Sequence, residues 1–500
     1  MNVLIVESPS KAKSINKYLG NSYKVLASVG HVRDLTAKND AIDTENNFQM
    51  KWETSDRGKK VIKDIANAAQ NSENLYLATD PDREGEAIAW HIEELLREMP
   101  KLANLNIHRI TFNEITKNAV LEALKEPRKV NENLVNAYLA RRALDFLVGF
   151  NLSPVLWRKL PGSKSAGRVQ SVALKIITER EFEIEKFNPE EYWSLKAIFN
   201  KGQEKEFESR LIKFKDEKIE KLTIKTESEA SNFLEKIQNS TYKVKEIQKK
   251  ETKRNPYAAF TTSSMQIEAS RKLGFSANQT MRTAQKLYEG IEINGEPTGL
   301  ITYMRTDSVL MSKDAIEEIR GFVSKKLGNE YIPAEPRIYK SKAKNAQEAH
   351  ECIRPTNIRL SPEELKKYLN SDEYKLYEII WQRAVSSQMA SAIIDQVLVD
   401  ITNEQDIIVF RSNGSSIKFP GMLAVYQETK EEDKKEDEDD KSSLLPPLVQ
   451  GDLLNLIKAE KNQHFTLPPP RYTEASLVKK LEELGIGRPS TYASIIKVLQ

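Results

Sequence analysis

Two groups of residues in this 500-residue chain have types and spacing that could do chemistry. Tyr303 lies two residues before Arg305, within the segment Gly-Leu-Ile-Thr-Tyr-Met-Arg-Thr-Asp-Ser at 299–308. A tyrosine has a pKa of about 10, so it needs a nearby cation to act as a nucleophile at neutral pH. Far upstream, three carboxylates alternate along a short segment: Asp80, Asp82 and Glu84. Carboxylates at this spacing are the hard oxygen ligands that Mg²⁺ prefers.

A second acidic residue follows an apolar run near the N-terminus. The run at 3–6 ends at Glu7, and the run at 75–79 ends at Asp80. Each run reads as a strand, and a helical pattern follows each. Strand, acid and helix, twice over, predict an α/β unit with parallel strands, in which ligands gather at the carboxyl ends of the strands. We therefore expect Glu7 and Asp80 to contribute to one acidic site.

Two roles are open for Glu7. It is either a further Mg²⁺ ligand or the acid that protonates a departing sugar oxygen, its pKa raised by the neighbouring carboxylates. Magnesium in such a site positions a phosphodiester and offsets its charge. The alternative for the whole cluster is a solvated loop whose acids cap a helix.

The tyrosine needs help from its surroundings if it is to attack phosphorus. Arg305 can stabilise the phenolate and the phosphate, and Lys11 and the metal can supply the remaining positive charge. The alternative is that Tyr303, one of 17 tyrosines, only packs in a core.

Composition limits the class of protein. Charged residues make up 30% of the chain, no apolar run is long enough to span a bilayer, and the N-terminus lacks the pattern of a secretion signal. One cysteine, Cys352, excludes an internal disulfide and a cysteine-rich zinc site, which favours a cytoplasmic protein. The net charge of +3 includes an acidic run at 430–440 that is typical of a solvated loop. The rest is more basic, which permits a nucleic-acid partner.

Changes of periodicity predict domains inserted within one another. We expect an α/β domain at 1–126, a helical domain at 127–188 and 450–500, a β-rich domain at 189–258 and 392–449, and a helical domain carrying Tyr303 at 259–391. The chain ends inside an expected helix, which predicts that the natural protein continues.

The segments 6–13 and 79–86 together resemble the Toprim domain, which topoisomerases, bacterial primases and some nucleases share. The segment around Tyr303 resembles the active-site segment of type IA DNA topoisomerases, in the version found in bacterial topoisomerase I. Topoisomerase III usually has proline where this chain has Met304. Further segments at 165–170, 346–355 and 484–493 resemble that family in the same order, so the resemblance covers essentially the whole chain.

The resemblance implies a Rossmann-like Toprim domain with helical and β-rich domains closed into a torus. It implies relaxation of negatively supercoiled DNA through a 5′-phosphotyrosine link, dependent on Mg²⁺ and independent of ATP. The expected enzyme is a cytoplasmic, nucleoid-associated monomer acting on single-stranded regions, with no membrane or nucleotide partner. The implied catalytic residues are Tyr303, Arg305, Glu7, Lys11, Arg168 and His350, and the implied metal ligands are Glu7, Asp80, Asp82 and Glu84. The implied DNA contacts are His31, Arg141, Arg142, Asp145, Phe150, Trp157, Ser165, Ala166, Gly167, Arg168, Val169, Gln170, Arg305 and Arg488.

Several of these residues have plainer interpretations. Arg141 and Arg142 fit a solvated helix face, Trp157 fits a core position between helices, and His31 fits a strand end. His350 either assists proton transfer or DNA binding, or caps a helix. The stretch at 162–168 nearly matches a phosphate-binding loop, but it has arginine in place of the lysine and follows a helix, so a nucleotide site there is rejected.

Three other functions remain as alternatives. Topoisomerase III is the nearest enzyme. A Toprim nuclease or primase would leave Tyr303 as a packing residue. A DNA-binding protein without catalysis would not need the acidic cluster.

Overall fold

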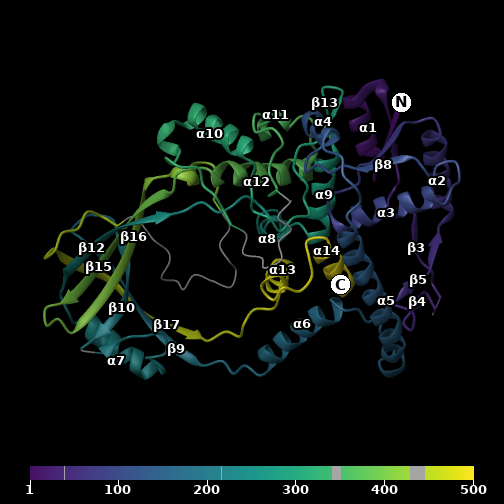
Figure 1. The fold of residues 1–500 in the computed structure, drawn as a ribbon. Helices are drawn as coiled ribbons and strands as arrows, with labels where there is room; N and C mark the ends of the chain where they lie inside the picture. The colour runs from purple at the N-terminus through teal and green to yellow at the C-terminus, as the bar shows by residue number, and fades with distance from the viewer. Residues whose placement is uncertain (39, 216, 341–350, 428–444) are drawn as a thin grey trace.

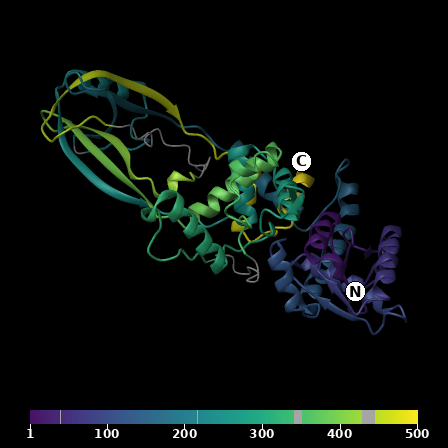
Figure 2. The same cartoon turned by 90° about the horizontal axis from the view of Figure 1, so that it is seen from above.

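The computed structural model of the chain describes residues 1–38, 40–215, 217–340, 351–427 and 445–500. Its elements follow a ring, with the N-terminal domain at one end and a large sheet at the other (Figures 1 and 2). The expected combination of α/β, helical and β-rich parts is confirmed. Within the described ranges, no helix is long and apolar enough to cross a membrane.

The N-terminal domain is built on four parallel strands in the order β2-β1-β7-β8. The strands are β1 (Asn2–Val6), β2 (Tyr23–Ala27), β7 (Asn74–Leu77) and β8 (Asn106–Arg109). Its helices are α1 (Pro9–Leu19), α2 (Asp56–Ala69), α3 (Arg83–Arg97) and α4 (Lys117–Lys125). Short pairs β3 (Arg33–Leu35) with β6 (Trp52–Thr54) and β4 (Ile42–Asp43) with β5 (Gln49–Met50) extend from it. The predicted parallel α/β unit is therefore present.

Strand β1 is buried on both faces, which places it at the centre of two cores. Val3 and Ile5 pack with residues of α2 and α3. Leu4 and Val6 point the other way, into a cluster that also contains Tyr303. The N-terminal domain and the domain that carries the tyrosine thus share one continuous apolar core.

The helical parts lie between the N-terminal domain and the large sheet (Figure 1). The long helix α5 (Glu132–Lys159) and α6 (Gln170–Glu185) form one side. The other side contains α8 (Thr262–Leu273), α9 (Ala277–Glu289), α10 (Lys313–Leu327), α11 (Pro362–Leu365) and α12 (Ser371–Ser387), with the hairpin β13 (Ile291–Ile293) and β14 (Glu296–Thr298). The last helices are α13 (Glu474–Glu483), which packs on α8, and α14 (Tyr492–Leu499), which packs on α9 and α6.

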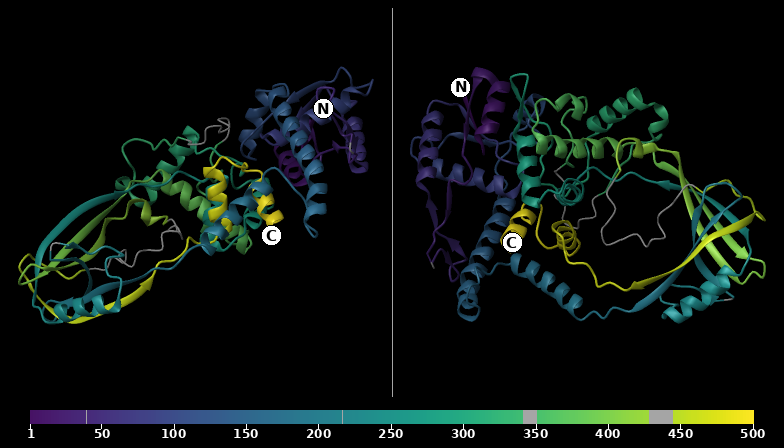
Figure 3. Two further views of the ribbon diagram at one scale, coloured as in Figure 1. Left: turned by 90° about the horizontal axis from the view of Figure 1, so that it is seen from below. Right: turned by 180° about the vertical axis from the view of Figure 1, so that it is seen from behind.

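Seven strands form the sheet at the far end, in the order β11-β10-β16-β15-β12-β17-β9. They are β9 (Glu191–Asn200), β10 (Phe207–Phe214), β11 (Glu217–Lys218), β12 (Tyr242–Arg254), β15 (Ala392–Asn403), β16 (Ile408–Phe419) and β17 (Leu453–Phe465), and α7 (Glu227–Gln238) packs against them. Figure 3 shows from behind how two arms join this sheet to the helices: α6 and α13 lead into one, α8 and α12 into the other.

Strand β17 corrects the expected domain division. The sequence predicted a helical piece from 450 to 500, but 453–465 is a strand that pairs with β9 and β12. A register shift between Leu456 and Lys458 interrupts its alternation of apolar and polar residues. This shift is a β-bulge, and because strand prediction depends on regular alternation, the sequence pattern did not indicate a strand here.

Candidate active site

Glu7 and Asp80 meet at the carboxyl edge of the parallel sheet, as the sequence predicted. Asp80 follows β7, Glu7 follows the neighbouring β1, and the backbone N–H of Asp80 donates to Oε1 of Glu7 at 3.0 Å. Lys11, from the first turns of α1, forms an ion pair with Asp80 and lies 3.8 Å from Oε2 of Glu7. The Ser8 side chain caps α1 by accepting from the backbone N–H of Lys11, and so fixes the position of Lys11 beside the site.

Burial and crowding of charge separate the pKa values of these two carboxyls. Burial and the charge of Asp80 raise the pKa of Glu7 well above its ordinary value, and Lys11 only partly offsets this. Burial would also raise the pKa of Asp80, but its contacts with Lys11 hold that pKa below the ordinary range. One carboxyl that tends to keep its proton therefore lies beside one that stays ionised.

Asp82 joins the acidic segment to the tyrosine. It is the N-cap of α3: Oδ1 accepts from the backbone N–H of Gly85 at 2.8 Å. Its second oxygen, Oδ2, accepts from the hydroxyl of Tyr303 at 2.8 Å. Residue 85 must be glycine, because a Cβ there would lie 2.2 Å from the carbonyl oxygen of Asp80. The helix cap thus holds a carboxylate directly on the tyrosine hydroxyl.

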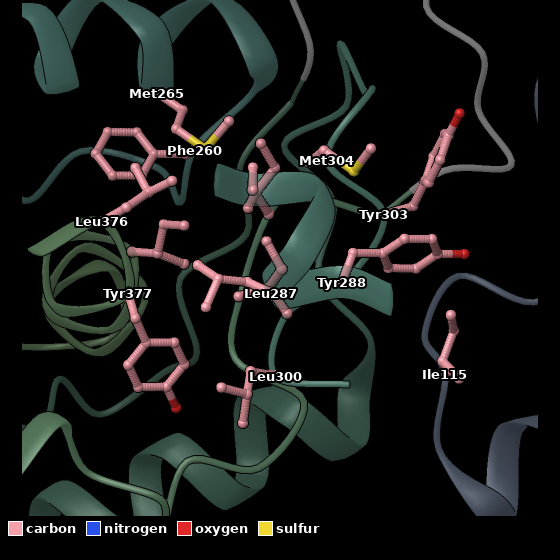
Figure 4. Packing of buried hydrophobic residues seen from close by; sticks show 14 of the residues in the cluster. Ile115, Phe260, Met265, Leu287, Tyr288, Leu300, Tyr303, Met304, Leu376 and Tyr377 are labelled. Carbon is pink, nitrogen blue, oxygen red and sulfur yellow. The ribbon is translucent and has the colours of Figure 1, made fainter. Parts of the chain in front are cut away.

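Tyr303 is 2% exposed and lies at the edge of the shared core beside Tyr288 (Figure 4). Burial raises its pKa well above the usual 10, and the nearby charges of Asp82 and Asp80 raise it further, against the opposing charge of Arg305. In this arrangement the phenol keeps its proton. A nucleophilic role for this hydroxyl would therefore need additional positive charge in the site.

Arg305 spans the second half of the acidic segment. Its Nη1 lies 3.2 Å from Oε2 of Glu84 and 3.7 Å from Oδ2 of Asp82. Burial would lower the pKa of Arg305, but the negative charges around it raise that pKa, so the guanidinium stays charged. Glu84 also contacts His31, whose Nε2 lies 3.3 Å from Oε1 of Glu84. Through its contacts with His31 and Arg305, and despite burial, the pKa of Glu84 falls to about 2.

The four acids supply the oxygen ligands that a magnesium site uses, but their side chains are not arranged around one ion position. Glu7, Asp80, Asp82 and Glu84 line one pocket of about 400 Å³, together with Arg305. Across the residues that the structure describes, no three His, Cys, Asp or Glu side chains are grouped as metal ligands. Burial first and the charges of Asp80 and Asp82 second raise the pKa of Glu7, and a divalent cation would offset the charge of these carboxylates. Glu84 would have to exchange its present partners, His31 and Arg305, for the ion.

A second pocket, of about 330 Å³, lies between the acidic segment, at Asp82 and Glu84, and helix α5. Its lining includes Arg141, Arg142, Asp145 and Arg488, all of which the family resemblance implied as DNA contacts, and also Arg305. Tyr138, on the same helix, stacks on His31 with ring centroids 5.7 Å apart. His31 thus lies between the acidic segment and the groove along α5.

The rest of the implied DNA contacts lie farther along this face. Trp157 is 53% exposed rather than a core residue, and its Nε1 donates to the carbonyl of Lys164 at 2.6 Å. Phe150 is also exposed and stacks on Phe146. The residues Ser165, Ala166, Gly167, Val169 and Gln170 lie between α5 and α6 or at the start of α6.

Arg168 forms an ion pair within the protein. Its Nε lies 2.9 Å from Oδ1 of Asp145, and Nε of Arg141 lies 3.6 Å from Oδ2 of the same carboxylate. Arg168 is not among the residues lining either described pocket. His350 lies outside the described residues. Cys352 is fully buried, as a small apolar side chain would be.

Sequence reasoning missed several residues around the tyrosine. Tyr288 packs edge-on against Tyr303, at 5.4 Å between ring centroids, and its buried hydroxyl has no hydrogen-bond partner. Arg282 and Lys497 line the acidic pocket from α9 and α14. A helical face spaced 278, 282 and 285 was readable, but no local signal indicates what it faces.

Comparison with known proteins agrees with this geometry. Residues 129–500 match the family model described as DNA topoisomerase, and residues 2–115 match the Toprim domain. DNA topoisomerase 1 of Rickettsia felis is 53% identical over all of this chain and 64% of its own length, and that of Xylella fastidiosa is 50% identical over 61% of its length. The chain thus spans somewhat under two thirds of these relatives.

A solved structure is also similar. Full-length topoisomerase I from Thermotoga maritima matches with a TM-score of 0.84 and 39% identity, over 99% of this chain and 78% of that one. Since a family model covers well over half of the residues and both halves of the site fall within matched regions, the chain belongs to the DNA topoisomerase family and carries a Toprim domain.

Proposed function

We propose that this chain is the catalytic part of a type IA DNA topoisomerase I that relaxes negatively supercoiled DNA. The observation that carries the proposal is the hydrogen bond from the Tyr303 hydroxyl to Asp82, a residue that lines one pocket together with Arg305 and three further acids. A packing tyrosine needs no carboxylate on its hydroxyl. A nucleophilic tyrosine needs a group to receive its proton.

The proposed reaction exchanges one phosphoester for another. The Tyr303 oxygen bonds to the backbone phosphorus while the bond to the sugar 3′ oxygen breaks, which leaves a 5′-phosphotyrosine and a free 3′ hydroxyl. Asp82 is placed to receive the tyrosine's proton. Glu7, with its raised pKa, is suited to give a proton to the departing oxygen, and Lys11 and Arg305 offset charge on the phosphate.

Magnesium is the proposed cofactor, held by Asp80, Asp82 and Glu84, with Glu7 as either ligand or acid. When bound, it supplies positive charge close to the phosphodiester. Because the covalent link conserves a phosphoester, resealing needs no ATP, and torsion in underwound DNA drives relaxation.

The proposed substrate is a single-stranded region that lies along α5. Arginines there can hold phosphates, and exposed aromatic side chains such as Phe150 and Trp157 can stack on bases. Passage of the intact strand requires the domain with Tyr303 to separate from the Toprim domain. We further propose a monomer that works in the cytoplasm, in association with the nucleoid.

A denaturing adduct assay tests this proposal. The wild-type chain, incubated with end-labelled single-stranded DNA and Mg²⁺ and then denatured, should retain label on protein. Tyr303→Phe should retain none. Tyr377→Phe is the matched control, since Tyr377 is equally buried but donates to the carbonyl of Leu360. Adduct on Tyr303→Phe would refute the assignment, and cleavage without any adduct would favour a Toprim nuclease.

A further inference from the structure

Two helices form the wall of the acidic pocket that faces the carboxylates. Asn278, Arg282 and Gln285 line it from α9, spaced i, i+4 and i+7 on one helical face. Ser494 and Lys497 line it from α14, three residues apart and so also on one helical face. Because α9 packs on both α14 and α1, this wall is fixed relative to the acidic segment.

The charges of the two walls are opposite. One carries the carboxylates Glu7, Asp80, Asp82 and Glu84, and its cations, Lys11 and Arg305, are already paired with them. The pocket lining from α9 and α14 contains no acid. Arg282 and Lys497 are exposed, and in the described part of the chain neither lies within ion-pair distance of a carboxylate.

A neighbouring lysine on α9 makes the contrast clear. Lys286 is also exposed, but it lies outside the pocket and its Nζ is 3.6 Å from Oε1 of Glu373. The two cations that face the acids are thus the ones left available for an external anion.

We propose that Arg282 and Lys497 form a phosphate-binding subsite that holds the backbone of the single strand beside the phosphate to be cleaved. This inference rests on the proposed function. A DNA strand that reaches Tyr303 enters a pocket lined by four acids, and their repulsion must be offset. Cations on the opposite wall draw the backbone away from the carboxylates while keeping it within reach of the tyrosine.

Salt-dependent binding tests the subsite without relying on cleavage. In the Tyr303→Phe background, the affinity for a single-stranded oligonucleotide is measured over a range of salt concentrations in Arg282→Gln/Lys497→Gln, with Lys286→Gln as the matched control. Each lost phosphate contact should reduce the slope of log K against log salt by about 0.7, so the double variant should lose about 1.4. Its affinity at low salt should fall about tenfold or more.

A charge-conserving variant separates electrostatics from folding. Arg282→Lys/Lys497→Arg should keep the slope of the parent. A slope unchanged in the double Gln variant, or lowered as much in Lys286→Gln or in the charge-conserving variant, would overturn the subsite. If the chain with Tyr303 intact forms no adduct while the slope still falls, the proposed reaction fails and the subsite stands.

Discussion

At the scale of single residues, Asp82 has two separate bonding tasks. One carboxylate oxygen caps α3 and the other accepts from Tyr303. The cap could be predicted, because acids before a helix are typical N-caps. The contact with Tyr303 could not, because it joins residues 221 positions apart.

Substitutions at Asp82 should separate these tasks. Asparagine can still cap the helix through its side-chain oxygen, whereas alanine cannot. We expect the free energy of unfolding of Asp82→Ala, measured by denaturant titration, to be about 1 kcal/mol lower than that of Asp82→Asn. Adduct formation should fall at least about a hundredfold in both. An active Asp82→Asn variant would show that the second oxygen has no role in the reaction.

Tyr288 and Tyr377 offer a second test on side-chain hydroxyls. Both side chains are fully buried. The Tyr377 hydroxyl donates a hydrogen bond to the carbonyl of Leu360 at 2.7 Å, whereas the Tyr288 hydroxyl has no hydrogen-bond partner. Tyr377→Phe should cost about 1 kcal/mol of unfolding free energy, while Tyr288→Phe should leave it unchanged or raise it. Equal losses in chemical denaturation would mean that the Tyr288 hydroxyl is paired in solution.

At the scale of elements, the two strand–acid–helix units were predictable because their signals are local. Strands β1 and β7, the cap at Ser8 and the helices that follow all have clear sequence patterns. Strand β17 was not predictable, because its bulge breaks the alternation. The position of α9 and α14 beside the acids was also not predicted, because packing between helices distant in sequence determines it.

A buried ion network fixes α3 beneath the acidic segment, and its pH dependence can be predicted. Glu86 accepts from Arg109 and Arg128, and despite burial these contacts lower its pKa. A carboxyl whose pKa is lowered in the folded state stabilises the protein at pH values above its ordinary pKa of 4.5. This stabilisation is lost as the pH falls through the folded-state pKa. Glu86→Gln should therefore cost about 3 kcal/mol at pH 7.

The difference between Glu86→Gln and wild type should shrink as the pH falls below 4.5. Thermal unfolding followed at several pH values measures it. A difference that stays constant across this range would exclude the ionised carboxylate as its source.

At the scale of the whole molecule, the shared core between the Toprim domain and the domain of Tyr303 creates a requirement for opening. Leu4 and Val6 pack in the same cluster as Tyr303, so the proposed nucleophile is covered in this closed ring. The ring of domains was implied by family resemblance, whereas the shared core depends on three-dimensional packing that one sequence does not display.

A covalent tether across this contact should block passage without blocking cleavage. Lys13 on α1 and Glu292 on β13 are exposed, with Nζ and Oε2 3.5 Å apart. Lys13→Cys/Glu292→Cys joined by a short bis-maleimide should still form adduct with a short oligonucleotide but should not relax a supercoiled plasmid. The same variant without the linker should do both, and Cys352 is buried away from the reagent. Relaxation by the tethered chain would refute opening at this contact.

The central claim is that Tyr303 itself becomes bonded to a 5′ phosphate. Mass spectrometry of the trapped, digested adduct tests this most directly. We predict that the peptide containing Tyr303 carries the added nucleotide mass and that the released strand ends in a free 3′ hydroxyl. Nucleotide mass on any other residue, or a 3′-linked phosphate, would contradict the account.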